Sequence, residues 1–409
     1  MLNKAGQREL AYVVRIDGIE PIPGYDRVEA AIVGGWRVIV RKDQFKVGDP
    51  AIYFEIDSKV PEDKEYFAFL EKRHYKVKTL RMCKTISQGL LMSAEDFGWE
   101  GFPEANIDAP CVKDDKGIFH YADSEDRFLT KQLGVTYADA EDNQRKAPSV
   151  DKYKRMAQRH PNVFKKSWAR WMMKRNWGRK VMFFFFGKKK DKKSGWPEWV
   201  KKTDEERIEN MPWILQDKTK PWIATEKIDG TSTTFTLKRG LFKDTFYVCS
   251  RNVVFDTPDK GCFYETNVYT EMAEKYHIRE KMTELLHNQF KDCDWITIQG
   301  ETYGAGIQKN DYGIDEHGFM AFNFITSKDG RWNSVDMREL LEFKMGIPCV
   351  PIVNKHYIMP DTIYELRDYV NHEFSVLNEK MREGIVFRSL DGVESFKCVS
   401  PEYLMKYHG

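Results

Sequence analysis

A block of positive charge divides the sequence and limits which parts of it can fold together. Between Arg145 and Lys202 there are 20 lysines and arginines but three acidic residues, a net charge of +17 in a chain whose overall formal charge is +2. Blocks of like charge are typical of nucleic-acid-binding segments and also of solvated linkers. We therefore predict a folded domain over residues 1–95, an acidic connector with the basic insertion over 96–205, and a second folded domain over 206–409.

Residues 1–95 have the pattern of a small β domain. The Gly34-Gly35 pair separates the segments EAAIV and WRVIV, which is typical of a hairpin turn. Further on, Ile52, Phe54 and Ile56 alternate with other residues at the period of a strand. Several short strands in about 90 residues suit a small barrel such as an OB fold, although other small β domains share this pattern.

Residues 206–409 alternate strand and helix patterns, which predicts an α+β domain. The segments 267–290 and 361–374 have apolar residues at helical spacing, and TDEERIEN (203–210) has the pattern of a capped helix start. Within the basic block, residues 164–180 place Trp168 and Trp171 on one helical face. Such a face is more often part of a core than a stacking platform for bases.

The composition excludes several classes of protein. The longest apolar run, Val181 to Phe186, is far shorter than the roughly 20 residues that span a bilayer. The first residues lack the apolar core of a signal peptide. The seven cysteines are scattered and never form CxxC, which argues against a disulfide framework or a cysteine zinc site. We expect a cytoplasmic protein that does not bind membranes, in the host cytoplasm if the chain is viral.

Lys227, in the segment WIATEKIDGTSTTFTL (222–237), is a candidate nucleophile. It lies between two apparent strands and just before a glycine turn. Desolvation and nearby positive charge lower the pKa of a lysine, and its neutral amine can then attack phosphorus and form a covalent intermediate. KxDG alone is a weak signal, so the residues that follow must support it.

An ordered series of further candidate residues follows Lys227. An aromatic side chain can stack on a base, carboxylates can bind ribose and Mg²⁺, and cations can neutralise a phosphate. Taken singly, the aromatic residue fits a core, the last glutamate a surface position and the arginine a structural ion pair. Six motifs in this order and spacing favour one nucleotide site instead. The series is Arg251, Glu301, Phe322, Glu383, Lys397 and Lys406.

These segments resemble motifs I, Ia, III, IIIa, IV and V of the covalent nucleotidyltransferases, the superfamily of ATP-dependent polynucleotide ligases and capping enzymes. GETYGAGIQKNDYG followed by GFMAFNF is most similar to RNA ligases that seal nicks in duplexes. VGDPAIYFEIDSKVP and YKVKTLRMCKTISQGLLM resemble the N-terminal OB module of RNA ligases of the Deinococcus–Naegleria type, and WVKKTDEERIENMP fits the same family. The resemblance implies an OB-like β-barrel followed by an adenylyltransferase domain, and it leaves the basic insertion aside.

The resemblance implies a role for each candidate residue. Lys227 would carry AMP as a lysyl-adenylate, Asp229 and Gly230 would complete motif I, and Thr225–Glu226 would face adenine. The remaining roles are Arg251 on the sugar or phosphate, Glu301 on the ribose, Phe322 stacked on adenine, Glu383 on a hydrated Mg²⁺ or Mn²⁺ ion, and Lys397 and Lys406 on the phosphate.

Two positions depart from the family pattern. Asn323 stands where related ligases often have aspartate after the aromatic residue of motif IIIa. Some relatives have Lys-x-Lys in motif V, but here Val399 lies two residues beyond Lys397, and we assign the second lysine to Lys406.

The function implied is an ATP-dependent RNA ligase that joins 3′-OH and 5′-phosphate ends through lysyl-AMP and an adenylylated 5′ end. Its expected partner is nicked duplex RNA or an RNA/DNA hybrid, and we expect it to act as a monomer. The alternatives are a capping-type guanylyltransferase, a DNA ligase and a non-catalytic nucleic-acid-binding protein. Capping enzymes usually carry the OB domain after the nucleotide domain, and the intact Lys227 and Glu383 argue against a silent protein.

The basic insertion is expected to serve the nucleic-acid steps and not the adenylylation of the lysine. Neutralising five of its lysines should weaken RNA binding and reduce the salt dependence of binding, by about 0.7–0.9 in log–log slope for each phosphate that a lysine no longer neutralises. Self-adenylylation, which needs no RNA, should be nearly unchanged. The five residues are Lys188, Lys189, Lys190, Lys192 and Lys193.

Overall fold

The chain forms two compact units, the first made of Met1–Tyr137 and Pro197–Gly409 and the second of Ala138–Trp196. The structure is a computed structural model, and the five lysines of the basic run lie outside the residues it describes. No helix among the described residues is long and apolar enough to cross a membrane. The described residues are 8–83, 85–101, 111–113, 119–121, 127–138, 161–186, 196–201, 205–251, 254–255, 267–371 and 374–408.

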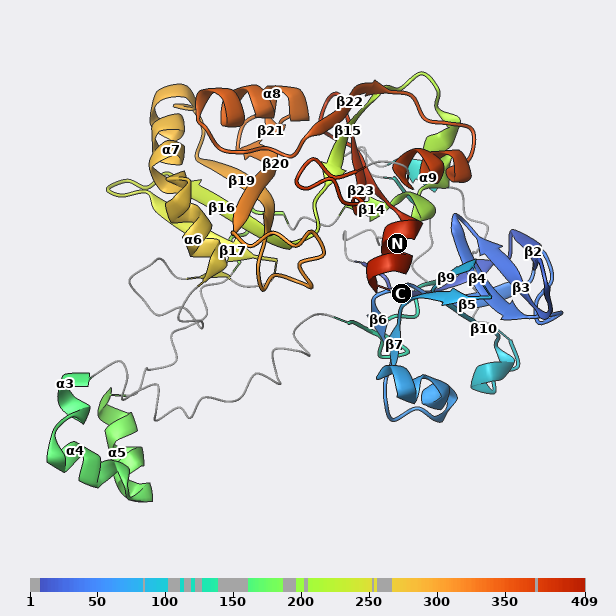
Figure 1. Ribbon diagram of the computed structural model, residues 1–409, viewed down its shortest axis with the longest axis horizontal. Helices are drawn as coiled ribbons and strands as arrows, with labels where there is room; N and C mark the ends of the chain where they lie inside the picture. The colour runs from blue at the N-terminus through green and yellow to red at the C-terminus, as the bar shows by residue number, and fades with distance from the viewer. Residues whose placement is uncertain are drawn as a thin grey trace. The chain divides into compact units, whose positions relative to one another are not determined.

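The N-terminal part of the first unit consists of short antiparallel strands, as expected for an OB-like barrel (Figure 1). One sheet has the order β1-β5-β10, a second β2-β3-β4 and a third β13-β6-β7, while β8 pairs with β9. Gly34 and Gly35 connect β3 to β4, where Val33 pairs with Trp36, so the predicted hairpin is confirmed. The bounds are β1 (Ala11–Arg15), β2 (Gly18–Ile22), β3 (Tyr25–Val33), β4 (Trp36–Arg41), β5 (Pro50–Phe54), β6 (Ser58–Lys59), β7 (Lys76–Val77), β8 (Thr79–Met82), β9 (Thr85–Gln88), β10 (Leu90–Met92) and β13 (Thr136–Tyr137), with 3₁₀ helices at Glu65–Arg73 and Glu95–Phe97.

Both faces of the β1-β5-β10 sheet are buried, each against its own hydrophobic cluster. Tyr53 belongs to one cluster and Phe54 to the other, so the strand alternates between two cores and not between core and solvent. Leu129, Leu133 and Val135 are buried in the cluster that contains Phe54. Residues 127–138, which we predicted within the connector, therefore pack with the N-terminal domain. Also in the connector region, β11 (Cys111–Lys113) pairs with β12 (Phe119–Tyr121).

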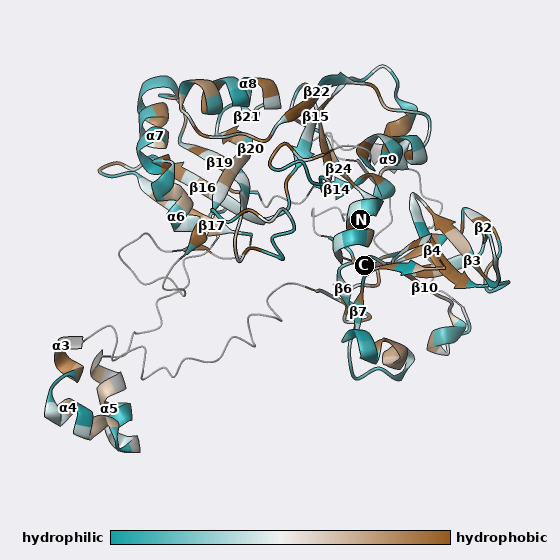
Figure 2. Cartoon of the chain, viewed as in Figure 1, coloured by the Kyte–Doolittle hydropathy of each residue, from teal (hydrophilic) through white to brown (hydrophobic). Residues whose placement is uncertain are grey.

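The C-terminal part is the expected α+β domain and is built on two sheets. The larger has the order β18-β17-β16-β19-β20-β21 and the smaller β14-β24-β23-β15-β22. Figure 2 shows hydrophobic residues along the inner strands and polar residues on the outer turns of the helices. The bounds are β14 (Glu206–Arg207), β15 (Trp222–Lys227), β16 (Thr231–Lys238), β17 (Thr245–Ser250), β18 (Val254–Phe255), β19 (Trp295–Tyr303), β20 (Gly318–Thr326), β21 (Gly330–Arg331), β22 (Ile352–Tyr357), β23 (Gly384–Ser389) and β24 (Ser395–Val399).

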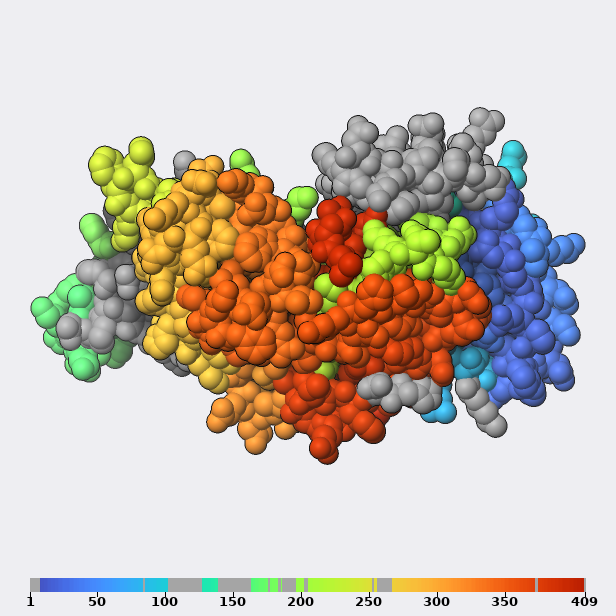
Figure 3. Space-filling model, turned by 90° about the horizontal axis from the view of Figure 1, so that it is seen from above, coloured from blue at the N-terminus to red at the C-terminus, as the bar shows by residue number. Residues whose placement is uncertain are grey.

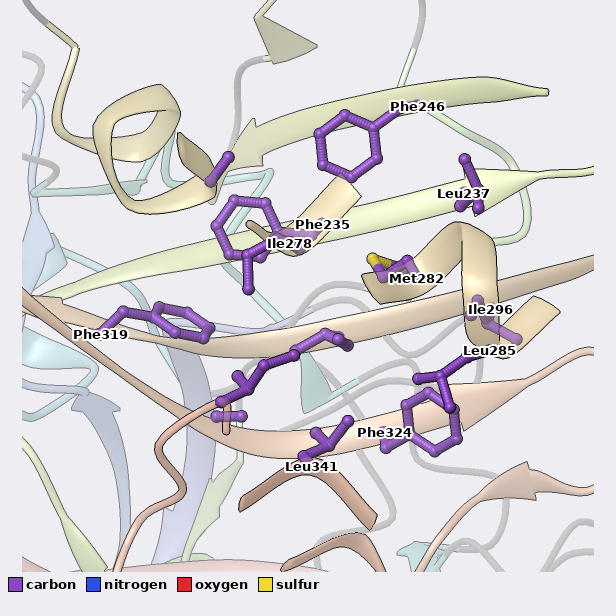
Figure 4. Packing of buried hydrophobic residues seen from close by; sticks show 14 of the residues in the cluster. Phe235, Leu237, Phe246, Ile278, Met282, Leu285, Ile296, Phe319, Phe324 and Leu341 are labelled. Carbon is purple, nitrogen blue, oxygen red and sulfur yellow. The ribbon is translucent and has the colours of Figure 1, made fainter. Parts of the chain in front are cut away.

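Helices cover the larger sheet and form its core. Phe235 and Phe319 of the sheet pack against Ile278, Met282 and other apolar residues of the helices (Figure 4). The bounds are α6 (Val268–Lys275), α7 (Ile278–Glu284), α8 (Ser334–Arg338), α9 (Ile363–Asn371) and α10 (Pro401–Tyr403), with π-helical turns at Leu285–Gln289, Glu339–Lys344 and Leu404–His408 and 3₁₀ helices at Ile208–Asn210 and Pro212–Gln216.

Two helix predictions are wrong in detail. The segment 267–290 is not one helix, because His277 has a left-handed backbone (φ 52°) that separates α6 from α7. The segment 203–210, which the structure describes from residue 205, does not begin an α-helix: β14 pairs in parallel with β24, a 3₁₀ helix follows at Ile208–Asn210, and Glu209 and Asn210 are buried. Figure 3 shows the chain before β15, in light green, between the blue N-terminal domain and the orange-red C-terminal strands.

The second unit contains the helices α3 (Pro161–Phe164), α4 (Ser167–Met173) and α5 (Asn176–Phe186). Its buried core comprises Phe164, Ala169 and Met182. Trp168 and Trp171 are each 49% exposed, so the aromatic face that we expected to be core is on the surface.

Candidate active site

Lys227 and Glu383 meet where two neighbouring strands approach each other. Lys227 is the last residue of β15 and pairs with Gly384, the first residue of the antiparallel strand β23. This register brings the Lys227 Nζ to 2.6 Å from the Glu383 Oε2, across 156 residues of sequence. A Cβ on Gly384 would lie 2.4 Å from the Cys398 carbonyl oxygen, so only glycine allows β23 and β24 to approach this closely beside the site.

Two further carboxylates face Lys227, and both resist ionisation. Burial and the nearby charge of Glu383 raise the pKa of Asp229 to about 7, although Lys227 opposes the shift. Burial raises the pKa of Glu301 to about 8, with Lys227 again opposing and Glu383 and Asp229 adding to the rise. Glu301 lies within β19, opposite Ser232. Near neutral pH, these two groups are therefore at least partly protonated.

These carboxylates also control the state of Lys227. Burial lowers the pKa of the lysine, but the charges of Glu383, Glu301 and Asp229 outweigh burial and raise it above its ordinary value of 10.5. Our expectation of a lowered pKa is therefore wrong for the protein without nucleotide, because the neighbours of the lysine are anions. The amine is protonated at neutral pH and must lose a proton before it can attack.

Gly230 allows the turn after Lys227 to lie against β19. A Cβ at this position would lie 2.4 Å from the Thr302 carbonyl oxygen and 3.0 Å from the Cγ of Glu301. Any other residue would push the turn away from Glu301. The glycine of the KxDG segment is thus required for the carboxylates to converge on the lysine.

Phe322 lies at a β-bulge that turns it toward the site. In the pairing of β19 with β20, Gln299 pairs with Asn323 and Gly300 with Ala321, so Phe322 is the extra residue. Bulges re-aim side chains and are common beside active sites. Phe322 packs against the small cluster that includes Ile228 and is not part of the main core. The adjacent Asn323 is buried and donates to the Gln299 Oε1 at 3.0 Å, so the departure from aspartate supports the sheet.

Arg388 is a buried cation beside Phe322 that the sequence analysis missed. Its Nη1 donates to the Thr225 Oγ1 at 2.9 Å, and its guanidinium carbon lies 5.8 Å from the centre of the Phe322 ring. Burial lowers the pKa of Arg388 to about 10, with Glu205 opposing. The alternation of side chains along a strand could have placed Arg388 on the same face of the sheet as Lys227. It could not have predicted that Arg388 is buried.

Glu226 points to the opposite face of β15 from Lys227. Its Oε2 accepts a hydrogen bond from the Val376 N–H at 3.2 Å, whereas its buried Oε1 has no hydrogen-bond partner among the residues that the structure describes. Burial raises the pKa of Glu226. A buried carboxylate oxygen without a donor is costly, so this atom is suited to accept a hydrogen bond from a ligand.

Lys397 is on the same face of the sheet as Lys227, whereas Lys406 is on the C-terminal helical turn. Thr225 pairs with Val386 and Val386 with Lys397, which puts Lys397 in the row next to Lys227. Val399 occupies the row of Lys227 itself. Lys406 is exposed, and the contact described for it is with the ring of its neighbour Tyr407. Its role at the phosphate stays a prediction.

Arg251 follows β17 and lies close enough to Glu301 for its charge to lower the pKa of that carboxyl. Its guanidinium carbon is 4.7 Å from the centre of the Tyr137 ring. The structure therefore brings Lys227, Asp229, Arg251, Glu301 and Glu383 into one electrostatic cluster.

A tyrosine of the C-terminal helix completes the site and was not found from the sequence. The Tyr403 hydroxyl lies 3.1 Å from the Asp229 Oδ2 and 3.3 Å from the Asp311 Oδ2. The Tyr312 hydroxyl accepts a hydrogen bond from the Asp229 N–H at 3.1 Å. These groups hold Asp229 in place, and no local pattern marks Tyr403 because its partner is 174 residues away.

The carboxylate cluster fits a divalent cation that is held mainly by ligands from outside the protein. Among the described residues, no three His, Cys, Asp or Glu side chains could hold a metal by themselves. Mg²⁺ typically takes one or two protein carboxylates and completes its shell with water and phosphate oxygens. Burial and, to a smaller extent, the neighbouring carboxylates raise the pKa values of Asp229 and Glu301, and a bound cation would favour their ionised forms.

A strand-end lysine paired with a glutamate, further carboxylates around it and a nearby aromatic side chain are the features expected of a covalent nucleotidyltransferase site. Two family models match the chain. Residues 220–408 match the RNA ligase family model, and residues 10–94 match an OB-fold domain model. The match over residues 220–408 confirms the expected resemblance to RNA ligases, the match over residues 10–94 confirms the expected OB domain, and the expected enzyme class is confirmed.

Solved structures with the same fold cover nearly the whole chain. The Naegleria gruberi RNA ligase with PPi is 25% identical, with a TM-score of 0.68, over 98% of this chain and 99% of that chain. A mutant of that ligase with AMP and Mn is 24% identical, with a TM-score of 0.69, over the same shares. An apo mutant is 25% identical, with a TM-score of 0.68, over 98% of each chain. No curated protein sequence matches the chain.

Proposed function

We propose that the protein is an ATP-dependent RNA ligase that acts through a lysyl-AMP intermediate on Lys227. The observation that carries the proposal is the Lys227–Glu383 contact of 2.6 Å, inside a domain of the RNA ligase family and surrounded by carboxylates. Structures of the similar Naegleria gruberi ligase with ATP and Mn, with AMP and Mn, and with PPi support the same choice of nucleotide.

In the first step, the amine of Lys227 forms a bond to the α-phosphorus of ATP while the bond to the pyrophosphate oxygen breaks. The lysine must first pass a proton to a neighbouring base, and Glu383 is already in hydrogen-bond contact with its Nζ. Phe322 stacks on adenine, and the unpartnered Glu226 Oε1 accepts from the adenine amino group. Lys397 offers positive charge to the phosphates. Mg²⁺ or Mn²⁺ bound at Glu383 would supply positive charge that favours the neutral amine and stabilises the phosphoryl transfer.

In the second step, the AMP moves from Lys227 to the 5′-phosphate of the RNA, which restores the free lysine. In the third, the neighbouring 3′-hydroxyl attacks the activated 5′-phosphate, a phosphodiester forms and AMP leaves. The substrate we propose is nicked duplex RNA or an RNA/DNA hybrid, bound by a monomer in the cytoplasm. Sealing rates on nicked RNA duplexes, nicked RNA/DNA hybrids and unpaired RNA ends test the choice of substrate, and sedimentation of the free protein tests the monomer.

Incubation with α-labelled ATP and Mg²⁺, followed by a denaturing gel, tests the proposal. The wild type should become labelled and Lys227→Ala should not, whereas the exposed Lys243→Ala should label normally. Label from GTP but not from ATP would favour a capping-type guanylyltransferase. Sealing of DNA nicks in preference to RNA nicks would favour a DNA ligase. No label from either nucleotide would favour a non-catalytic binding protein.

A further inference from the structure

Neither of the two family models includes the helical insertion. The two family models match residues 10–94 and 220–408, whereas helices α4 and α5 lie between these ranges and in a separate compact unit. The insertion thus lies outside both sequence models, and we consider its surface by itself.

The described helices of the insertion carry charge of one sign. Residues 161–186 contain seven lysines and arginines and no acidic residue. Among the most accessible are Lys165, Lys166, Arg170 and Lys174, all of which are exposed. Such a surface attracts polyanions, and each phosphate neutralised by a cation adds to affinity and to its salt dependence.

The same helices carry large exposed aromatic rings. Trp168 and Trp171 are each 49% exposed and Trp177 is 53% exposed. Trp171 and Trp177 meet edge to face with ring centres 6.1 Å apart, and the Arg175 guanidinium carbon lies 3.7 Å from the centre of the Trp171 ring. We call Trp171, Arg175 and Trp177 the aromatic cluster.

Close packing of helices α4 and α5 holds the aromatic cluster in place. The Arg179 Nε donates to the Met173 carbonyl at 2.7 Å across the turn between α4 and α5. A Cβ on Gly178 would lie 2.1 Å from the Met172 carbonyl oxygen, so only glycine allows the two helices to approach this closely. The cluster thus projects from a packed helical pair and not from a loose tail.

We propose that helices α4 and α5 bind unpaired nucleotides of the RNA substrate. Bases stack on Trp171 and Trp177, and phosphates contact Arg170 and Lys174 beside them. Basic grooves with exposed aromatic rings are the general means by which proteins hold single-stranded nucleic acid. This inference rests on the proposed RNA ligase function and adds to it: the preferred substrate combines a duplex nick with an unpaired extension.

An anionic membrane is the other polyanion that a basic aromatic surface can bind. RNA fits better because the Arg175 guanidinium covers the Trp171 ring. Inserting that ring among acyl chains would bring the guanidinium with it, at a high cost. In contact with RNA, the Trp171 ring can lie against a base while the Arg175 guanidinium remains near a phosphate.

The test compares sealing and binding of two nicked RNA duplexes, identical except that one carries an unpaired extension. The wild-type full-length protein should bind the extended substrate about tenfold more tightly, because stacking of one or two bases contributes that much. Trp171→Ala/Trp177→Ala should lose this preference and label with ATP as the wild type does. Trp171→Phe/Trp177→Phe should retain most of it, which separates stacking from misfolding of the helices.

Charge is tested separately with a matched control. Arg170→Gln/Lys174→Gln should reduce the salt slope of binding by up to about 1.4, since each phosphate contact on a single strand contributes about 0.7. Lys291→Gln/Lys344→Gln, which removes two exposed charges of the catalytic domain, should leave the preference for the extension unchanged.

Two results would overturn the inference while the ligase function stands. One is equal affinity of the wild type for both duplexes, with normal ATP labelling. The other is a loss of binding to phosphatidylglycerol vesicles in the double alanine variant without any change in RNA binding. Failure of the wild type to label with ATP would instead refute the proposed function.

Discussion

The carboxyl groups around Lys227 affect both the reactivity of the lysine and the stability of the folded protein. Asp229, Glu301 and Glu383 are held beside one ammonium group, and the pKa values of the first two are raised to about 7 and about 8. The folded protein therefore retains protons that the unfolded chain would release. Ionising these groups at alkaline pH costs folding free energy, and a bound cation would remove that cost.

Glu301→Gln should stabilise the ligand-free protein at alkaline pH. The pKa of Glu301 rises from its ordinary value of 4.5 to about 8 on folding, so stability falls as pH increases through this interval. At pH ~9 the free energy of unfolding of the variant should exceed that of the wild type by at least about 1 kcal/mol, because a shift of one pKa unit corresponds to ~1.4 kcal/mol. Urea titrations without metal measure this difference.

Near pH ~4.5 the wild type and Glu301→Gln should be equally stable, because Glu301 is then protonated in the folded protein. Glu316→Gln, whose side chain is 91% exposed, should show no pH-dependent gain. A constant difference at every pH would mean that Glu301 is not strained in the folded state.

Phe322 and Phe324 differ in role although they are two residues apart in β20. Phe322→Leu should raise the KM for ATP about 2- to 10-fold, the range expected when an aromatic side chain no longer stacks on the base. Phe324→Leu, in the main core and 0% exposed, should lower the unfolding free energy by about 1–2 kcal/mol and leave the KM nearly unchanged. Adenylylation kinetics of both variants measure the KM for ATP, and urea titrations measure the free energy of unfolding. Equal effects on both measurements would indicate that Phe322 is an ordinary core residue.

At the scale of elements, the break between α6 and α7 sets how the helices pack on the larger sheet. Periodicity predicts one helix across 267–290, yet Met272 and Ile278 on either side of the break are both fully buried. The left-handed backbone of His277 turns the second helix so that it, too, faces the sheet. The change of direction between α6 and α7 thus requires a strained backbone conformation at His277.

His277→Gly should stabilise the protein by up to about 1 kcal/mol, because glycine adopts positive φ without the steric penalty of a Cβ. His277→Ala keeps the Cβ and should give no such gain, so the glycine variant should unfold at higher urea concentration than the alanine variant. If alanine is the more stabilising, the segment prefers a continuous helix in solution.

At the scale of the molecule, a buried polar network joins the N-terminal and catalytic domains of the first unit. The Asn210 Oδ1 accepts from the Trp36 Nε1 at 2.7 Å and the Tyr12 hydroxyl at 3.2 Å, and its Nδ2 donates to Glu55 and Glu206 at 2.8 Å each. Arg367 adds a bond to the Gly35 carbonyl at 2.9 Å. Such networks are costly when partly satisfied, so they favour one arrangement of the two domains.

Asn210→Ala should reduce the unfolding free energy by about 2–4 kcal/mol, because it leaves the Trp36 N–H and the Glu55 carboxylate buried without this partner. Calorimetry should show the two domains of the variant melting separately, whereas the wild type melts in one transition. Trp36→Phe, which removes one donor, should cost less. Unchanged melting of Asn210→Ala would mean that the domains are not coupled through this network.

Local patterns in the sequence identified most of the elements and supplied the candidate residues of the site. The Gly34-Gly35 hairpin follows from residues adjacent in the chain. The resemblance of the ordered motifs indicated RNA ligases and singled out Lys227, Glu301 and Glu383, which the structure brings together. All of these depend on short-range patterns or on their order, which a sequence displays directly.

Long-range contact decided the rest. The partner of Lys227 is 156 residues away and that of Tyr403 is 174 residues away, so neither the raised pKa of the lysine nor the role of the tyrosine is visible locally. The same holds for the helix break at His277 and for the exposed tryptophans of the insertion, because burial depends on what else packs nearby. The sequence by itself determined which chemistry the chain can carry, and the tertiary structure determined the charge around the lysine, because electrostatic energies depend on distances that only folding sets.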